Sequence, residues 1–411
     1  MNFSLGRVIL IVSILSMGTA CTTCTNCSSS HDDDIRVEPS CPPVPPTPQP
    51  ICMQEEFCCN GVCEIIEVQP NSQSQPQPES SCGCKSVFVF EELDDPNGYL
   101  DLLAGQQYAY IVGFNQLTDQ RFGRRMFDAV RHLLNSPCSI SMDVELWSSF
   151  GGGLTHVKGD RNDRGYHANN VDVSIGAHTK ISQFLFGIAA DYEKDNVDFK
   201  HGGHNVWHTG QGAFYGAYQS QCFYIYSDLI LGGSFSKFNR PLEFEGIERK
   251  AKSTPKCGHG RLYGEFGWNF MPCGLLLQPY FGFDGNYTKF KGIHENGASS
   301  LNLTVNSKSV AGWDTYLGVH FTAAIVEYVK ANIDLAWQHR FTNSHSLTAS
   351  LSGLGQSFNF KSFDYGLNGF QGALNLNAEV SENVELYGEV VGEFWDNWNS
   401  AEFNAGLNLW F

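Results

Sequence analysis

The chain ends with the stretch Ser400-Ala-Glu-Phe-Asn-Ala-Gly-Leu-Asn-Leu-Trp-Phe411. Apolar side chains recur at every second position, namely Phe403, Ala405, Leu407, Leu409 and Phe411. The positions between them are polar or small: Glu402, Asn404, Gly406 and Asn408. Because side chains alternate between the two faces of a strand, this pattern predicts a strand with one apolar face. A closed ring of such strands, apolar outside and without free edges, is the β architecture that a lipid bilayer accepts.

The two-residue rhythm fills residues 139–411 and predicts twelve strands. In the second segment Val171 and Val173 flank Asp172, and in the eleventh Leu386 follows Glu385. Tight turns are expected near 181–183, 219–221, 272–274, 324–326 and 381–383. Long polar loops are expected at 154–168, 194–209, 237–257, 288–309 and 341–368, with a short last loop at 396–399. Alternating short and long connections are typical of outer-membrane barrels, so residues 137–411 predict an all-β, 12-stranded antiparallel transmembrane β-barrel.

The N-terminus has the features of an export signal. Arg7 supplies a positive charge, an apolar core follows at 8–15, and Gly18-Thr19-Ala20 provides small residues for cleavage. Residues 1–20 are therefore predicted to be a signal peptide. The mature chain would begin at Cys21, which is a candidate for lipidation.

Residues 21–105 differ sharply in composition from the rest of the chain. They carry 14 acidic and 2 basic side chains, ten of the 14 cysteines and eleven of the 16 prolines. Such a segment buries little apolar surface, so we expect a largely disordered Cys/Pro-rich arm, with local structure at 57–68 and 87–90. An exported chain reaches an oxidising compartment, which favours disulfides whose pairing the sequence leaves open. The net charge of −17 argues against nucleic-acid binding.

A helix is predicted at residues 118–135, within a linker spanning 106–136. Thr118 would cap it, Asp119 would lie in its first turn, and Pro137 follows its end. Apolar residues recur at helical spacing: Phe122, Met126, Val130 and Leu133. Arginines occupy much of the remaining surface: Arg121, Arg124, Arg125 and Arg131. The pattern fits an ordinary amphipathic periplasmic helix, and it also fits a plug inside a polar barrel.

Several short motifs, in order, resemble those of the autotransporter β-domain, the translocator of type V secretion. They are Val171-Asp-Val-Ser-Ile-Gly176, Phe184-Leu-Phe-Gly-Ile-Ala-Ala-Asp-Tyr192, Leu277-Gln-Pro-Tyr-Phe281, Ser309-Val-Ala-Gly-Trp-Asp-Thr-Tyr-Leu-Gly318 and the terminal strand. The resemblance covers residues 137–411, although the family's usual arginines are missing from the fourth motif. The long loops and the Cys-rich segment also resemble chlamydia-like envelope proteins.

The resemblance implies that a lumenal α-helix precedes the first strand and joins the barrel to an N-terminal passenger. The four arginines would then pair with carboxylates predicted to line the lumen, including Asp143, Glu145, Asp172, Glu265, Glu385 and Glu389. It also implies that Phe403, Leu407, Leu409 and Phe411 form a C-terminal signal for the barrel assembly machinery.

The sequence predicts no enzyme and no catalytic, cofactor-binding or metal site; a loop with His201, His204 and His208 is the best metal candidate. We expect an outer-membrane autotransporter-type barrel that anchors, and translocates to the cell surface, its own short passenger. The alternative is a porin-like or structural envelope protein whose arm stays periplasmic and is cross-linked by disulfides. The expected partners are outer-membrane lipid, the barrel assembly machinery and disulfide-linked envelope proteins.

Overall fold

The computed structural model describes residues 54–59, 62–67, 87–88, 106–108, 110–134, 144–159, 165–200, 203–220, 222–244, 247–271, 275–342, 345–353, 357–362 and 365–411. All of them belong to one of two compact units, Cys52–Phe411. The predicted signal peptide, Cys21 and most of the arm lie outside the described residues. Within the described residues, no helix is both long enough and apolar enough to cross a membrane.

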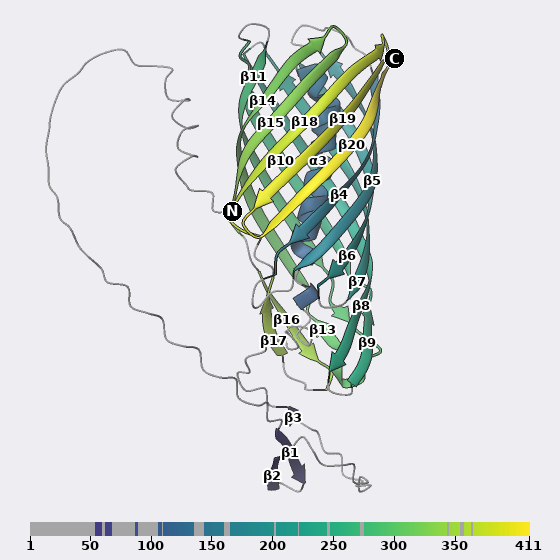
Figure 1. Cartoon of the computed structure of the whole chain (residues 1–411), viewed down its shortest axis with the longest axis vertical. Helices are drawn as coiled ribbons and strands as arrows, with labels where there is room; N and C mark the ends of the chain where they lie inside the picture. The colour runs from purple at the N-terminus through teal and green to yellow at the C-terminus, as the bar shows by residue number, and fades with distance from the viewer. Residues whose placement is uncertain are drawn as a thin grey trace, which may run out of the picture. The chain divides into compact units, whose positions relative to one another are not determined.

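Twelve antiparallel strands form a closed barrel, which confirms the predicted fold (Figure 1). They are β4 (Val144–Val157), β5 (Tyr166–Ile181), β6 (Phe184–Phe199), β7 (His204–Gln219), β8 (Phe223–Phe244), β10 (Lys256–Trp268), β11 (Leu276–Phe290), β14 (Lys308–Val326), β15 (Val329–Arg340), β18 (Asn368–Ser381), β19 (Val384–Trp395) and β20 (Trp398–Trp410). The last strand pairs with the first, for example Leu407 with Ser148, and this pairing closes the ring.

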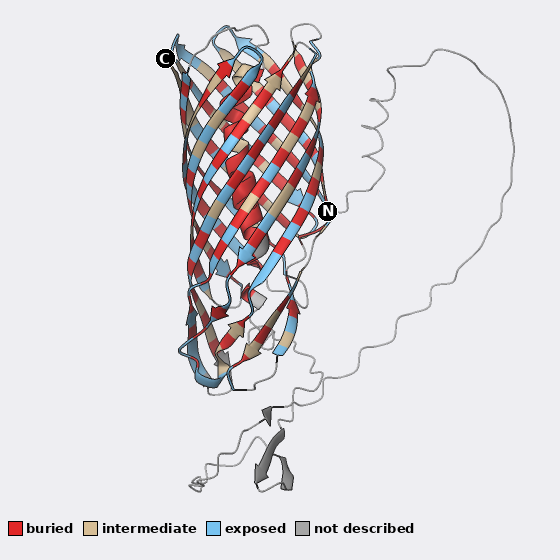
Figure 2. Ribbon diagram, turned by 180° about the vertical axis from the view of Figure 1, so that it is seen from behind, coloured by how far each residue is buried: buried red, intermediate tan, exposed pale blue. Residues whose placement is uncertain are grey.

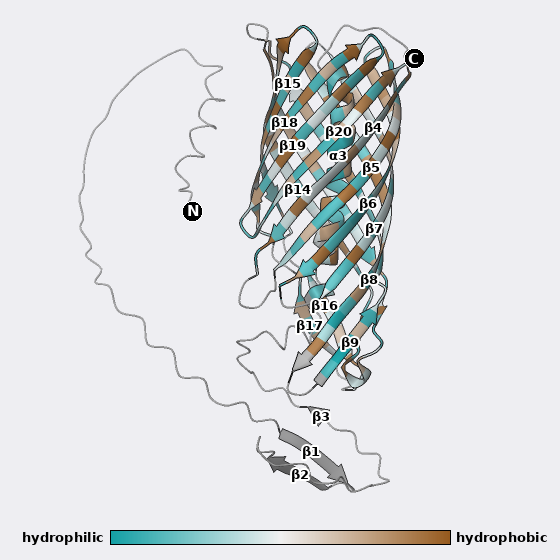
Figure 3. Cartoon of the chain, turned by 45° about the vertical axis from the view of Figure 1, so that its right-hand side comes forward, coloured by the Kyte–Doolittle hydropathy of each residue, from teal (hydrophilic) through white to brown (hydrophobic). Residues whose placement is uncertain are grey.

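Side chains alternate between the outer wall and the lumen along each strand. On β5, Val171 and Val173 are exposed on the outer wall whereas Asp172 and Ser174 are buried. Figure 2 shows the same alternation of buried and exposed residues along the strands, and Figure 3 shows hydrophobic and hydrophilic positions alternating there. The outer wall is therefore apolar and the lumen polar, as a membrane barrel requires.

The C-terminal residues take part in closing the barrel. Phe403 and Phe411 are exposed on the outer wall, and Leu407 and Leu409 lie on the same face, partly buried. The backbone N–H of Phe411 donates to the carbonyl oxygen of Val144 at 3.2 Å. The outward face predicted for this strand is present; its recognition by the assembly machinery stays a prediction.

The strands extend further than the predicted loops allowed. β6 continues to Phe199 and β7 begins at His204, so the long loop expected at 194–209 is a short connection. Likewise β4 reaches Val157 and β5 begins at Tyr166. Crossing a bilayer takes only about 9–11 tilted residues. The polar residues therefore belong to strands that continue beyond the membrane, where both faces of a strand tolerate polar side chains.

Three of the longer connections carry secondary structure that the sequence did not predict. They contain β9 (Ile247–Ser253), β12 (Ile293–His294), η3 (Ser299–Leu301), β13 (Leu303–Val305), β16 (Ser346–Leu351) and β17 (Ser357–Lys361). β9 pairs with the end of β8, and β12, β13, β16 and β17 form a four-stranded surface sheet. We call the end of the barrel that carries these longer connections the loop end, and the opposite end, with the short turns, the turn end.

Part of the arm forms a sheet of its own. β1 (Gln54–Cys59) pairs with β2 (Val62–Glu67) and with β3 (Val87–Phe88), near the two segments for which local structure was expected. In this hairpin Cys58 lies opposite Cys63. The cysteine side chains of the arm are not among those that the structure describes, so the disulfides stay a prediction.

The helix before the barrel is longer than predicted. α3 spans Ile111–Leu134 and follows a short turn, η2 (Gln106–Tyr108). Thr118 therefore lies inside the helix and does not cap it; its hydroxyl donates to the Phe114 carbonyl at 3.2 Å. The cap was misplaced because the residues before Thr118 lack a clear polar face; those with described burial, Ile111 and 113–117, are all buried.

Glycines on the lumen face make room for aromatic rings of neighbouring strands. A Cβ atom added at Gly406 would lie 2.3 Å from the Tyr387 ring and 2.5 Å from the Ser148 carbonyl oxygen. This site joins β19, β20 and β4, where the barrel closes.

Gly406→Ala should therefore lower barrel stability by about 1–3 kcal/mol, the usual cost of overpacking. The measurement is the temperature at which the purified barrel stops migrating as a compact band in gel electrophoresis. Gly264→Ala is the matched control, because a Cβ there meets nothing within 4 Å. Equal midpoints for both variants would contradict the packing argument.

Candidate functional site: the helix in the barrel lumen

α3 runs through the lumen from the loop end to the turn end (Figure 1). At its start, Tyr110 and Ile111 pack in one buried cluster with Tyr166, at the loop end of β5. At its other end, the Leu134 carbonyl accepts a hydrogen bond from the side chain of Gln219, next to the β7–β8 turn. The N-terminus of the helix thus points to the loop end, and the chain re-enters the barrel as β4 at the turn end.

Arg121 is enclosed by three carboxylates of the barrel wall. Its guanidinium lies 2.6 Å from Glu193, 3.4 Å from Asp195 and 3.0 Å from Glu402. Glu402 is shared with Arg124, whose nitrogen lies 3.4 Å from it. Strands β6 and β20, which lie on either side of β4 and β5, are thereby linked through one helical side chain.

Arg124 and Arg125 bind carboxylates on different strands. Arg124 Nη2 lies 2.5 Å from Glu393 on β19. Arg125 contacts Asp172 at 2.5 Å and Asp191 at 3.0 Å, on β5 and β6. Because these groups are buried, removing one partner would leave an uncompensated charge, at a cost of about 3–5 kcal/mol. The arginines therefore fix the position of the helix.

Arg131 is arranged differently from the other three arginines. It forms an ion pair with Asp128 one turn earlier on the same helix, at 3.2 Å. Its guanidinium also lies over the Phe127 ring, 5.1 Å from the centroid. Among the described residues, Arg131 thus has its closest ion pair within the helix.

Histidines provide further helix–wall contacts that sequence reasoning missed. Asp119, expected in the first helical turn, is buried in the third and pairs with His259 on β10 at 2.7 Å. His132, near the helix end, lies 3.1 Å from Glu145 on β4. The alternation of the strands could have shown that His259 faces the lumen. Predicting that it pairs with the helical carboxylate of Asp119 also requires knowing how deep the helix lies in the barrel.

The five predicted lumen carboxylates that the structure describes face inward, but four of them have partners other than the arginines. Asp172 is the one of the six found in an arginine ion pair among the described residues. The others pair with histidines, tyrosines or amides: Glu145 with His132 and His178, Glu265 with Tyr224 and Tyr263, Glu385 with Asn377 and Asn408, and Glu389 with Asn404. Asp143 lies outside the described residues. Alternation gives the face of each strand residue, but not its level relative to the helix, and this is why those pairings were wrong.

Two glycines show how closely the helix fits the wall. A Cβ added at Gly123 would lie 1.8 Å from the guanidinium of Arg261, which is itself held 2.8 Å from Asp284. At Gly113, a Cβ would lie 2.2 Å from the Tyr365 ring. Glycine weakens a helix by about 1 kcal/mol relative to alanine. Contact with the wall explains the glycine at position 123, and contact with the β17–β18 connection explains the glycine at position 113.

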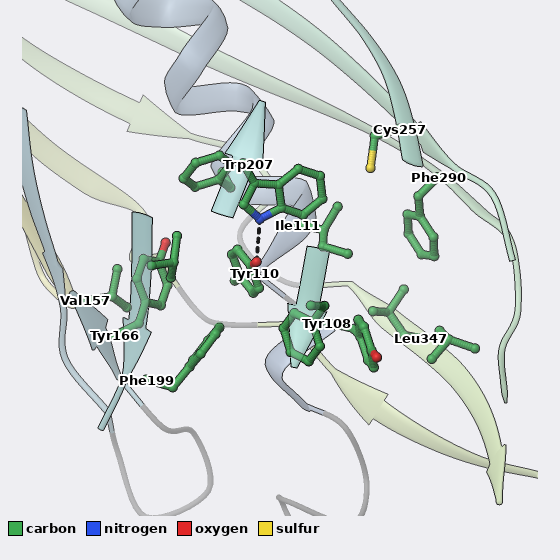
Figure 4. Close-up of a cluster of buried hydrophobic side chains, with 14 of the residues drawn as sticks. Tyr108, Tyr110, Ile111, Val157, Tyr166, Phe199, Trp207, Cys257, Phe290 and Leu347 are labelled. Atoms are coloured by element: carbon green, nitrogen blue, oxygen red, sulfur yellow. Dashed lines mark hydrogen bonds between the residues drawn. The ribbon is translucent and has the colours of Figure 1, made fainter. Parts of the chain in front are cut away.

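A buried cluster at the loop end, the outer collar, joins residues at the start of the helix to others from the barrel and the surface sheet: Tyr108, Tyr110, Ile111, Phe114, Trp207, Leu303 and Leu347. Figure 4 shows part of this cluster. The Tyr110 hydroxyl accepts a hydrogen bond from the Trp207 indole. The Tyr108 hydroxyl donates to Glu295 at 2.7 Å, and Glu295 also pairs with Arg240. Burial, reinforced by Glu295, raises the pKa of Tyr108 well above its usual range, so its hydroxyl remains a donor.

Of the three histidines proposed as the best metal candidate, the two that the structure describes have separate partners. His204 pairs with Asp198 at 2.7 Å, and His208 bonds with the Tyr192 hydroxyl at 2.8 Å. His201 lies outside the described residues. Among described side chains, no group of three or more potential ligands forms a metal site.

Residues 146–391 match the family described as autotransporter beta-domain. The fold is similar to the translocator domain of the autotransporter NalP from Neisseria meningitidis, with a TM-score of 0.60 and 10% identity, covering 74% of this chain and 100% of that one. The transport unit of AIDA-I from Escherichia coli also matches, with a TM-score of 0.47 and 14% identity, covering 69% and 97%. A comparison with curated proteins finds no significant match.

Reversing two helical charges should open the lumen. In the double variant Arg124→Glu/Arg125→Glu, new carboxylates would face Glu393, Asp172 and Asp191, so the helix should leave its position. We expect the ion conductance of the purified protein in planar bilayers to rise from a closed baseline to discrete open-channel steps.

The matched control is Arg124→Lys/Arg125→Lys, which keeps both charges and should stay closed. A charge-reversed barrel that folds and remains closed would show that the ion pairs do not hold the plug.

Proposed function

The chain belongs to the autotransporter β-domain family, and we propose that it is an outer-membrane translocator that carries its own N-terminal arm, residues 21–105, to the cell surface and anchors it there. On this proposal the chain has no enzymatic activity of its own. Its partners are outer-membrane lipid along the apolar wall and the barrel assembly machinery, which would read the outward face of β20.

The direction of α3 is the observation that carries the proposal. Short turns face the periplasm and long connections face outward in outer-membrane barrels. The helix enters the lumen at the loop end, where Tyr108 and Tyr110 are buried in the outer collar. Residues that precede Gln106 would therefore leave the barrel on the outer side, which is the arrangement expected after a passenger has crossed.

The filled lumen argues against a porin. The arginines of α3 and the barrel carboxylates that pair with them are buried, so water-filled space for solute diffusion is replaced by ion pairs. A porin conducts through a polar lumen that remains open. The alternative that keeps the arm in the periplasm would require the chain to enter the helix from the turn end.

The cysteines of the arm set a condition on export. A helix that contacts the wall at Gly123 and the Tyr365 ring at Gly113 leaves little room beside it. A disulfide-closed hairpin, such as one joining Cys58 and Cys63, is wider than an extended chain or a single helix. The arm would therefore cross with its thiols reduced, and its disulfides, including any to neighbouring envelope proteins, would form afterwards.

An epitope tag inserted near Gly61 tests the side on which the arm lies. We expect antibody to label intact cells as strongly as permeabilised cells. Two matched insertions calibrate the assay: one after Lys200 in the β6–β7 connection, accessible on intact cells, and one at Glu382 in the β18–β19 turn, labelled only after permeabilisation. If the tag at Gly61, like the one at Glu382, were labelled only after permeabilisation, the translocator proposal would be overturned in favour of a periplasmic envelope anchor.

A further inference from the structure

Lysines gather on the outer wall of three adjacent strands, beyond the aromatic residues of the loop end. The four are Lys237 on β8, Lys256 on β10, Lys289 on β11, and Lys291 directly after the end of β11; we call them the lysine cluster. All are exposed, and β10 pairs with both β8 and β11. Side chains alternate between the two faces of a strand. Cys257, next to Lys256, and Phe290, between Lys289 and Lys291, are buried, so these lysines face outward.

The register brings the positive charges close together. Lys256 lies opposite Lys291, whose backbone N–H donates to the Lys256 carbonyl at 3.1 Å. On β11, Lys289 lies opposite Gly258, which is two residues from Lys256. On β8, Phe235 lies opposite Lys256, and Lys237 is two residues further along. Like charges directly opposite each other in an antiparallel pair destabilise the sheet.

No carboxylate among the described residues forms an ion pair with these lysines. The outward lysine at the turn end behaves differently: Lys330 pairs with Glu379 at 3.0 Å. The lysine cluster is therefore a concentrated positive charge whose counter-ion comes from elsewhere.

The aromatic residues locate the cluster relative to the membrane. Phe235 and Tyr287 are about half exposed on the outer wall, and each is followed two residues later by a lysine of the cluster, Lys237 or Lys289. Aromatic side chains of this kind mark the membrane–water interface. Two strand residues span about 7 Å, so the ammonium groups reach the level of the lipid headgroups.

We propose that Lys237, Lys256, Lys289 and Lys291 form a binding site on the barrel wall for the phosphates of a lipid headgroup in the outer leaflet. The cluster projects sideways from the wall, whereas the chain that leads into the arm, at Gln107 and Tyr108, is buried inside the barrel. This geometry favours a membrane lipid over the acidic arm as the occupant. The proposal uses the orientation given above, with the loop end outward.

Native mass spectrometry of the detergent-purified full chain, titrated with lipid A bearing two phosphates, tests the site. A lysine near an anionic lipid surface contributes about five-fold in affinity, so Lys256→Gln/Lys291→Gln should weaken binding about thirty-fold. Lys237→Gln/Lys289→Gln should weaken it similarly. Lys256→Arg/Lys291→Arg and the distant Lys330→Gln should bind as the unmodified chain does. Compact migration without heating verifies that each variant is folded.

Three results would overturn the proposal. They are unchanged lipid A binding by both glutamine variants, equal binding of lipid A stripped of its phosphates, and displacement of lipid A by inorganic phosphate at the same concentration. A carbodiimide cross-link from Lys256 or Lys291 to an acidic residue of 21–105 that persists when lipid A is added would also overturn it, by assigning the cluster to the arm. Binding in detergent does not depend on the side on which the arm lies, so this test fails or succeeds independently of the translocator proposal.

Discussion

Charge compensation inside a closed lumen is the constraint on which the rest of the structure depends. The wall presents buried carboxylates such as Glu193, Asp191 and Glu393, and the helix supplies guanidinium groups to them. Each set of charges alone would bear the desolvation penalty without an opposite charge. Barrel and helix thus form one polar core with complementary charges, and the lumen of the twelve-stranded barrel holds the helix closely.

The lumen is closed by different chemistry in its middle and at its loop end. In the middle, ion pairs hold the helix, whereas at the loop end the outer collar surrounds Tyr110 with aromatic rings. The surface sheet contributes to that collar through Leu303 and Leu347, so the connections beyond the membrane help to close it. Strands that continue past the bilayer are what bring those connections together, and this explains why the predicted loops were too long.

The sequence was sufficient for the fold because alternation is a local property. Val171 and Asp172 reveal their faces by position alone, and the same holds for all twelve strands. It was not sufficient for the pairings within the lumen, which depend on how deep the helix lies and how it is rotated. Arg125 with Asp172 was within the predicted set, but Arg121 with Glu193 was not. Glu193 lies in a segment that was predicted to border a loop, so it was not counted among the lumen carboxylates.

If the arm is exported as proposed above, the same ion pairs constrain the order of events. A passing extended chain without arginines at matching levels would leave Glu193, Asp191 and Glu393 without their partners, so the lumen would have to be hydrated while the arm crosses. When α3 arrives, its arginines replace that water, and buried ion pairs form only at one depth of the helix. The free energy of closure is therefore available at the end of passage and opposes backward movement. In this scheme the last residues to cross would act as the stop, and the outer collar would then enclose the linker at Tyr108.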